Sequence, residues 1–276
     1  MRSMIFLLAV LASSGAAAAV AEGEAPITGQ GLDRLAAAAG IEVVGRTADL
    51  RVETPFGPIT ARPSGDATAR FAALFAEEFA VYPPALVRRS RLKRVVLGSG
   101  LAFDGQLRGA IPDFWHDALY LDVARGDYSP TYQRTAIHHE FFHLVDYRDD
   151  GEVYRDDAWA ALNPPGFRYG PGGKDVQGDA LGSLFTDKHP GFLTTYATAG
   201  VEEDKAEVFA RLLVAPREVA RRAGLDPILA RKVARMKARL KEFEPAVDDA
   251  FWSRVEARPT RPDGPPARPP GRDASR

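Results

Sequence analysis

The 276-residue sequence contains no cysteine, no marked excess of charge of either sign, and no apolar run long enough to cross a membrane comfortably. Without cysteine the chain can form neither disulfides nor metal–thiolate sites, so any metal must be bound by histidine or carboxylate side chains. Lysine and arginine total 36, aspartate and glutamate 37, and the formal net charge is -1. This balance argues against a nucleic-acid-binding protein, which would need a basic excess.

A short apolar run lies close to the N-terminus. It spans Met4–Ala12, follows the basic residue Arg2 and precedes small residues that include Ala19–Ala21. Basic, apolar and small segments in this order are typical of a cleavable signal peptide, which we place at residues 1–21. A buried N-terminal helix is the alternative interpretation. We expect the mature chain to be secreted or periplasmic and to have no membrane span.

Composition divides the remaining chain into three parts. Residues 22–65 are rich in Gly, Ala and Pro and their structure is uncertain, with a short helix expected at Gly31–Ala39 and two strands around a turn within Leu50–Ile59. Residues 66–256 combine helical and strand patterns, which predicts one α+β domain. Residues 257–276 contain mainly Pro and Arg with almost no apolar side chains, so this tail should be disordered.

Within the α+β part, apolar residues at intervals of three or four predict helices, and short runs of β-favouring residues predict strands. One helix should begin at Asp66 and end at Pro83-Pro84, and later helices should begin near Val201, ending before Pro216, and after Asp226. The strand candidates are Val95–Leu97, Gly109–Pro112 and Leu119–Val123. Residues 151–195, rich in Gly, Pro and Asp, predict a long irregular segment of a kind that is often functional.

One predicted helix contains the motif that carries chemistry. Ser129 suits the N-cap and Pro130 the first helical position, so this helix should begin here and run to about Tyr147. Inside it lies His139-Glu140-Phe141-Phe142-His143, an H-E-x-x-H sequence. Residues four apart share a helical face, so both imidazoles can bind one metal ion while Glu140 stands beside the open coordination position. The alternative is that two of five histidines lie four apart by chance on a buried helix.

A catalytic zinc site needs a third protein ligand, and the sequence offers two candidates. Asp149 stands where the third ligand occurs in closely spaced motifs, but Asp146 replaces the Gly that lets the helix turn, so Asp149 should point away from the ion. Glu203 and Glu207 lie four apart on a later helix, so one could ligate the ion and the other hydrogen-bond a ligating histidine. An acidic first helical turn is the alternative explanation, and it accounts less well for Glu207, which lies deeper in the helix.

These residues together resemble a known family. Tyr196 followed by Glu203–Phe209 matches the Y-x6-E-x-x-A-E-x-F signature of the anthrax lethal factor-like zinc peptidases, which are gluzincins and also carry H-E-x-x-H. The resemblance implies a zincin-like fold, with a small mixed sheet and an active-site helix followed by a mostly helical C-terminal subdomain. It further implies one zinc ion per chain, bound by His139, His143 and Glu203. Glu207 would support a ligating histidine, and Tyr196 would be a hydrogen-bond donor in the transition state.

The resemblance predicts an exported zinc metallopeptidase acting on a peptide or protein substrate. Glu140 would take a proton from the attacking water and pass it to the leaving amine, and Tyr196 would donate to the developing oxyanion. Two alternatives remain open: a non-catalytic binding or structural protein of the same fold, and a zinc hydrolase of cell-wall peptides. The sequence shows no counterpart of the toxin's large delivery domains, so toxin function is not implied.

Three further positions bear on the site. His138 points about 100° away from His139 on a helix, so we do not expect it to be a ligand. His189 lies near Tyr196 in the irregular segment and belongs either to the site or to the surface. The resemblance implies an edge strand that aligns the extended peptide, and Gly109–Pro112 is the candidate because Pro is tolerated only at sheet edges.

Overall fold

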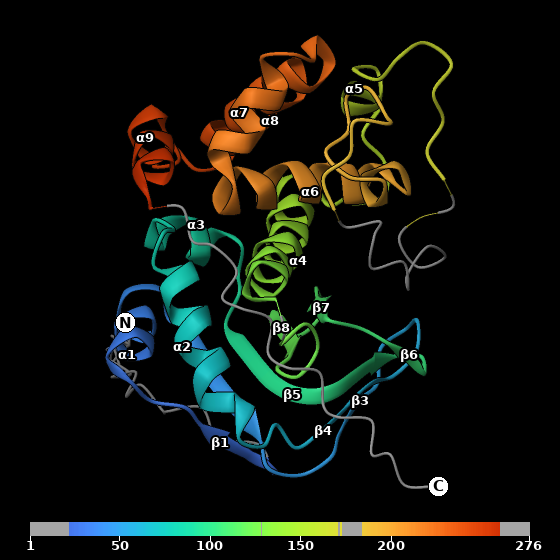
Figure 1. The fold of residues 1–276 in the computed structure, drawn as a ribbon. Coiled ribbons are helices and arrows are strands. Elements are labelled where there is room, and N and C mark those ends of the chain that lie inside the picture. The colour runs from blue at the N-terminus through green and yellow to red at the C-terminus, as the bar shows by residue number, and fades with distance from the viewer. Residues whose placement is uncertain (1–21, 128, 171, 173–183, 260–276) are drawn as a thin grey trace, which may run out of the picture.

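The computed structural model describes residues 22–127, 129–170, 172 and 184–259. The predicted signal peptide lies outside the described residues, as does the predicted tail from residue 260 onward. A mixed sheet, a set of helices against one face of it and a second group of helices beyond α4 make up the described chain (Figure 1). Across these residues, no helix has both the length and the apolar character needed to span a bilayer.

The sheet is built around the long strand β5 (Arg94–Phe103). The first half of β5 pairs in parallel with β2 (Glu42–Arg46) on one side and with β8 (Ala118–Asp122) on the other. β1 (Glu24–Pro26) and β7 (Ala110–Asp113) add antiparallel strands outside them. The order β1-β2-β5-β8-β7 therefore places β7 at one edge, as the prediction for Gly109–Pro112 required.

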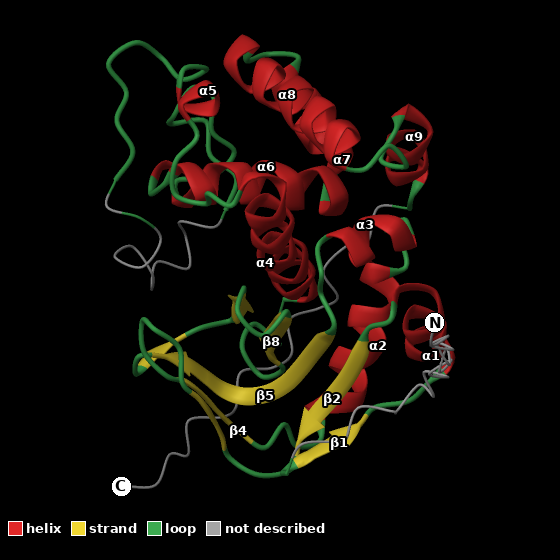
Figure 2. Ribbon diagram, turned by 180° about the vertical axis from the view of Figure 1, so that it is seen from behind, coloured by secondary structure: helices red, strands yellow, loops and turns green. Residues whose placement is uncertain are grey.

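The second half of β5 belongs to an antiparallel layer. It pairs with β4 (Ile59–Arg62), which pairs with β3 (Leu50–Val52), and β6 (Gln106–Leu107) flanks its end. Between the halves, Gly100 has φ +59°, and a Cβ at Gly98 would lie 2.9 Å from the nearest side chain of β4. These two glycines let β5 bend, so that its first half pairs with β2 and β8 and its second half with β4. The bend of the strand is visible in Figure 2.

The alternation of side chains along β5 separates two cores. Val95 and Leu97 point towards the helices together with their partners on β8, Leu119 and Leu121. Val96 points to the opposite face, into a smaller cluster that includes Tyr120, Ile59 and Leu101. Residues 22–65, whose structure the sequence left uncertain, supply strands β1 to β4 and thereby complete both layers.

The face of the sheet that carries Val95 and Leu97 is covered by α4 and by three further helices (Figure 2). They are α1 (Gln30–Ala39), α2 (Ala67–Phe79) and α3 (Pro84–Arg89). The prediction of a helix up to Pro83 was wrong in its end point, because α2 stops at Phe79. Pro84 instead occupies the first helical position of α3, where its missing N–H costs nothing.

The motif helix α4 (Pro130–Asp150) forms as predicted. The Ser129 side chain accepts a hydrogen bond from the backbone N–H of Tyr132 at 3.2 Å, and Pro130 follows the cap. Gly151 ends the helix in the left-handed conformation, with φ 82°. The middle of α4 is buried on nearly all sides, so this helix forms the centre of the molecule rather than a surface element.

The second group of helices lies beyond α4 (Figure 1). It consists of α6 (Val201–Val214), α7 (Pro216–Ala223), α8 (Pro227–Phe243) and α9 (Asp249–Ala257). The sequence predicted α6 and α8, but not α7 or α9. Pro216 was expected only to end a helix, whereas it also begins α7, again at the first position.

The segment between α4 and α6 is mostly irregular in its described part, as predicted. It contains the single turn α5 (Asp157–Ala160) and the short 3-10 helix η2 (Tyr196–Thr198). A bridge between Phe185 and Thr194 brings the chain back towards α6. This segment therefore lies next to the start of α6, where the site is found.

Candidate metal centre

The candidate site lies where α4 and α6 cross and pack against each other (Figure 1). The crossing brings together His139 and His143 from α4 and Glu203 from the first turn of α6. One ligand atom of each residue lies within 4.8 Å of those of the other two, and all three side chains are buried. These residues could hold a metal ion, and they are the three zinc ligands that the family resemblance implied.

The individual distances show how closely the donors converge. His139 Nε2 is 2.8 Å from Glu203 Oε2, and His143 Nε2 is 3.9 Å from the same oxygen. The two imidazole rings lie 5.0 Å apart between their centroids and are inclined by 77°. One turn of helix thus presents both rings to one carboxylate oxygen from a different helix.

The charges at the centre indicate a place for a cation. Burial alone would lower the pKa of His139, but its hydrogen bonds to Glu203 and Glu207 raise that pKa well above the usual value. Burial and the neighbouring charge of His139 lower the pKa of His143 to about 3, and His143 Nδ1 is buried without a hydrogen-bond partner in the described chain. Two imidazoles and a carboxylate are the donor set of a catalytic zinc site, so the residues fit that ion.

Glu140 adjoins this cluster and is partly exposed. The protein atoms that surround the carboxyl group remove much of its water, and this desolvation raises the pKa of Glu140 to about 7; the positive charges of His139 and Arg108 oppose the effect and the charge of Glu203 reinforces it. A carboxylate with a pKa near neutrality can exchange a proton during a reaction.

Arg108 was not anticipated from the sequence. It lies between β6 and β7, is 9% exposed, and donates from Nη2 to Gln106 Oε1 at 2.8 Å. No carboxylate of the described residues forms an ion pair with it, and its charge acts on Glu140 instead. No motif or spacing marks this arginine, because only the fold brings the β6–β7 link close to α4.

Tyr196 lies in η2, with its ring centroid 6.0 Å from that of His139. Burial raises the pKa of Glu203, but hydrogen bonds with His139 and with Tyr196 outweigh this and hold the pKa below its usual value. The structure therefore brings Tyr196 to the candidate ligands, with its side chain hydrogen-bonded to Glu203.

Glu207 lies one turn after Glu203, and its Oε1 is 3.2 Å from His139 Nδ1. Burial alone would raise its pKa, but the charge of Arg211 and hydrogen bonds with His139 and Thr194 lower it to about 2. Arg211 Nε is 3.3 Å from Glu207 Oε2. The spacing of four residues could have revealed the Glu207–Arg211 pair, whereas nothing local marks Thr194.

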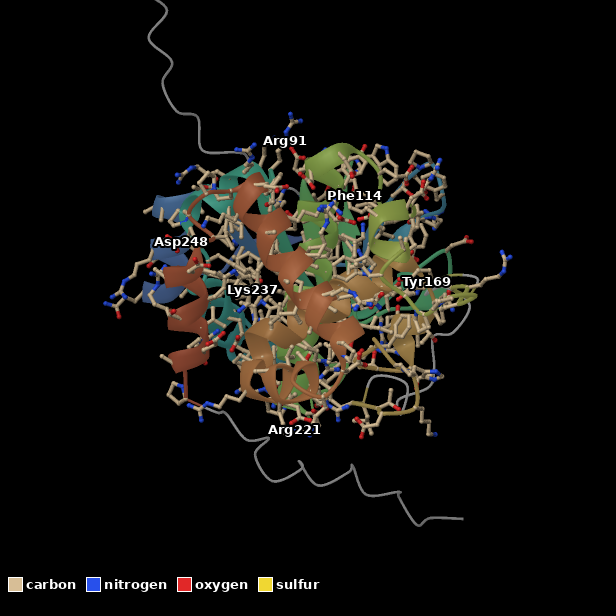
Figure 3. The ribbon with its side chains drawn as sticks, turned by 90° about the horizontal axis from the view of Figure 1, so that it is seen from above. Arg91, Phe114, Tyr169, Arg221, Lys237 and Asp248 are labelled. Atoms are coloured by element: carbon tan, nitrogen blue, oxygen red, sulfur yellow. The ribbon has the colours of Figure 1, made fainter. Side chains whose placement is uncertain are left out.

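Asp204 faces away from the cluster and fixes the irregular segment beside it. Its Oδ2 accepts hydrogen bonds from Trp159 Nε1 at 2.8 Å, from the Tyr169 hydroxyl at 2.7 Å and from Lys232 Nζ at 2.7 Å. Lys232 also donates to the carbonyl of Gly191 at 2.9 Å. Figure 3 shows Tyr169 on the side of the molecule formed by this segment. Sequence reasoning missed this network, because its members are far apart along the chain.

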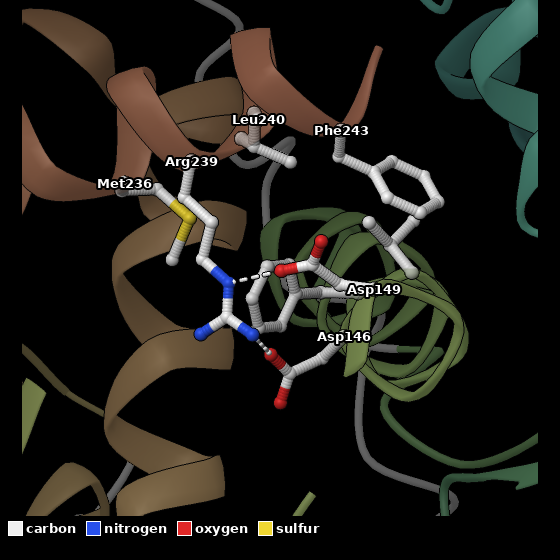
Figure 4. Close-up of a pocket in the computed structure, with 8 residues that line it drawn as sticks. Asp146, Asp149, Met236, Arg239, Leu240 and Phe243 are labelled. Atoms are coloured by element: carbon white, nitrogen blue, oxygen red, sulfur yellow. Dashed lines mark hydrogen bonds and ion pairs between the residues drawn. The ribbon is translucent and has the colours of Figure 1, made fainter. Parts of the chain in front are cut away.

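Asp149, the alternative third ligand, is not brought to the cluster. Its Oδ2 accepts from Arg239 Nε of α8 at 2.5 Å, and the same guanidinium lies 3.3 Å from Asp146 (Figure 4). Because α4 continues without a break to Asp150, Asp149 points towards α8, as the missing glycine predicted.

The remaining histidines of the prediction lie elsewhere. His138 is fully buried, with Nδ1 2.6 Å from the Tyr82 hydroxyl and Nε2 3.0 Å from Glu78 Oε2, so it faces α2 rather than the cluster. His189 is partly exposed and is not one of the clustered residues.

The predicted edge strand lies beside the site. β7 packs against α4 on one side of its length and pairs with β8 along one edge. Its other edge pairs with no strand of the described chain. An extended peptide could therefore add to this edge, close to the helix that carries Glu140.

Comparisons with known proteins concern the fold. No protein-family model matches the sequence, and no curated protein matches it. A crystal structure from Bacteroides caccae, of a protein named a "putative zinc-binding metallo-peptidase", is similar with a TM-score of 0.50 and 21% sequence identity. The similarity covers 85% of this chain and 95% of that chain. The chain thus has the mixed α+β fold that was predicted and shares it with that protein: a small mixed sheet, a central motif helix and further helices after it.

Proposed function

We propose that the protein is an exported zinc-dependent peptidase that hydrolyses peptide bonds. The observation that carries the proposal is the buried convergence of His139, His143 and Glu203, with Glu140 beside it. The name of the structurally similar protein supports the same activity. The spacing of Tyr196, Glu203 and the H-E-x-x-H motif favours the lethal factor-like gluzincins as the group, without the delivery function of the toxin.

His139, His143 and Glu203 would hold one zinc ion. Bound there, zinc lowers the pKa of a water molecule and polarises the scissile carbonyl. The Glu207 carboxylate lies at Nδ1 of His139, which would leave Nε2 available to hold the ion. The opposing charge of Arg211 holds Glu207 in the anionic form that this role needs.

Glu140 would act as the general base and then as the general acid. A pKa near 7 lets it take a proton from the attacking water and return the proton to the amine that leaves. Tyr196 would turn its hydroxyl from Glu203 to the developing oxyanion, where a neutral phenol can donate a hydrogen bond. The substrate would be an extended peptide or protein segment lying along the edge of β7.

The first experiment combines metal analysis with peptide cleavage. We expect about one zinc per purified chain, lost in Glu203→Ala and retained in a control, Glu242→Ala, whose side chain is exposed on α8. Cleavage of a peptide library should be abolished in Glu140→Gln with the zinc retained. Zinc binding without Glu140-dependent cleavage would instead identify a non-catalytic protein, and activity confined to cell-wall peptides would identify the other alternative.

A further inference from the structure

Four aromatic side chains lie next to one another at the end of β7. They are Phe56 from the β3–β4 turn, Phe114 and Trp115 from the β7–β8 turn, and Tyr147 from α4. The ring centroids are 4.7 Å apart for Tyr147 and Phe114, 6.1 Å for Phe114 and Trp115, and 5.5 Å for Trp115 and Phe56. This aromatic patch is therefore a continuous row of rings that runs from α4 to the tips of two hairpins.

The outer part of the aromatic patch is exposed although it is apolar. Phe56 is 67% exposed and Trp115 is 51% exposed, whereas the other two tryptophans, Trp159 and Trp252, are buried. Single apolar side chains on a surface are common, but large rings that contact one another and still face solvent are typical of binding surfaces. Aromatic residues, and tryptophan above all, contribute much of the binding energy at such surfaces.

The β7–β8 turn is fixed by hydrogen bonds that do not involve the rings. The buried Asp113 carboxylate accepts a hydrogen bond from the backbone N–H of Trp115 at 3.0 Å. Arg148 of α4 donates to the backbone carbonyl of Phe114 at 2.8 Å. The turn thus holds its two rings in a defined place, and a ligand that binds them pays little for ordering the surface.

The aromatic patch begins on the face of α4 that carries Glu140. Tyr147 comes seven residues after Glu140, so it points in nearly the same direction roughly 10 Å further along the helix. β7 lies beside this stretch of α4, because the Tyr132 hydroxyl at the start of the helix contacts Gly109 before β7, and Tyr147 contacts Phe114 after it. The edge of β7 that pairs with no described strand therefore leads from the surroundings of Glu140 to the patch.

We propose that the aromatic patch is a specificity subsite, which binds an apolar or aromatic side chain of the peptide substrate about three residues from the scissile bond. The inference rests on the proposed function and names the class of peptide that the site would prefer. A peptide added to the edge of β7 advances about 3.3 Å per residue, so the roughly 10 Å between Glu140 and Tyr147 corresponds to about three residues. Phe56 and Trp115 then offer ring faces and edges to the bound side chain.

Cleavage of peptides that differ at one position tests the proposal. Phe, Leu, Gly or Asp is placed at the second to fifth residue on either side of the scissile bond. At one of these positions Phe and Leu should raise kcat/KM at least about tenfold over Gly, the expected effect of burying one large apolar side chain. Trp115→Ser should remove most of this preference, and Trp115→Phe should keep part of it. With Gly at that position, the wild type and Trp115→Ser should cleave equally well.

Two variants guard against effects on folding. Phe56→Ser lies in the other hairpin and should reduce the same preference independently of the β7–β8 turn. Leu225→Ser removes an equally exposed apolar side chain before α8 and should leave the preference unchanged. A preference that survives in both Trp115→Ser and Phe56→Ser would overturn the subsite while leaving the peptidase activity established.

A binding measurement separates the subsite from catalysis. In Glu140→Gln, which should bind a peptide without cleaving it, the preferred peptide should protect the exposed Trp115 from fluorescence quenching by acrylamide, and the matching Gly peptide should not. Cleavage of no peptide by the zinc-loaded wild type would refute the proposed function itself. A wild-type dimer that Trp115→Ser converts to a monomer would assign the aromatic patch to a second copy of the chain and overturn the subsite.

Discussion

His139 lies between two carboxylates, with Nε2 2.8 Å from Glu203 Oε2 and Nδ1 3.2 Å from Glu207 Oε1. A neutral imidazole has one N–H and could donate to only one of them. A ring protonated on both nitrogens would donate to both carboxylates, and these two hydrogen bonds are what raises the pKa of His139. A bound metal ion would take the place of that proton on Nε2, and the Nδ1 proton would remain on the Glu207 side.

The contact with Glu207 leads to a first prediction. Glu207→Gln should weaken zinc binding by about 10- to 100-fold, because the amide supports the His139 ring less strongly than a carboxylate does. Competition with a fluorescent chelator measures the affinity. Glu242→Gln, on the exposed face of α8, is the control. An unchanged affinity in Glu207→Gln would show that His139 needs no support from this side.

Zinc should stabilise the folded protein. At a free zinc concentration about 1,000 times the dissociation constant, the free energy of unfolding should rise by about 4 kcal/mol, since only the folded chain assembles the three ligands. Thermal unfolding with and without a chelator measures this gain. His143→Ala should abolish it, and a full zinc-dependent gain in that variant would exclude His143 as a ligand.

Tyr196→Phe should separate catalysis from metal binding. Loss of the hydroxyl should lower kcat by about 10²- to 10³-fold, the usual effect of removing one oxyanion donor, with the zinc content unchanged. Steady-state cleavage of a peptide and metal analysis of the same sample test both parts. If Tyr196→Phe lost its fold instead, the tyrosine would be a packing residue.

Arg108 should set the pH dependence of the reaction. Its positive charge lowers the pKa of Glu140, so Arg108→Gln should raise that pKa. Because the general base must be deprotonated, the acid limb of the kcat/KM profile should then move to higher pH. Arg51→Gln, far along the chain in β3, should leave the profile in place. A shift to lower pH would contradict the assignment of Glu140 as the base.

The buried pair of Asp204 and Lys232 should matter for stability. Lys232→Met leaves the carboxylate of Asp204 without its cation and should reduce the free energy of unfolding by about 3–5 kcal/mol in urea. Lys237→Met, on the same helix, removes a surface pair with Glu256 and a contact of the ammonium group with the Trp252 ring, and should cost less than about 1 kcal/mol. Adding Asp204→Asn to Lys232→Met should restore part of the loss, and no recovery would mean that packing dominates.

The sequence predicted the motif helix well because its signals are local. A cap at Ser129, the following proline and two histidines four apart all act within one helix, and Glu203 and Glu207 obey the same spacing. The extent of β5 was underestimated, since Gly98 and Gly100 resemble strand breakers. Only pairing with β4, about 40 residues earlier, carries the strand through them.

Contacts between distant segments account for what was missed. Only after the chain has folded does the charge of Arg108 act on Glu140 and does Lys232 hydrogen-bond Asp204. The two helices that begin at a proline, α3 and α7, were missed for a different reason. Pro84 and Pro216 each separate two helices, and the sequence identifies the end of the first more readily than the start of the second.

Glu203 and Asp204 are adjacent in the chain and point in different directions from α6, Glu203 towards the metal centre and Asp204 towards the irregular segment. One added or deleted residue between Gly200 and Glu203 would rotate both side chains by about 100° around the helix axis. Glu203 would then leave the metal centre and Asp204 would lose its hydrogen bonds to the irregular segment at the same time. This stretch therefore admits changes of residue type far more readily than changes of length, and insertions should accumulate in the irregular segment instead.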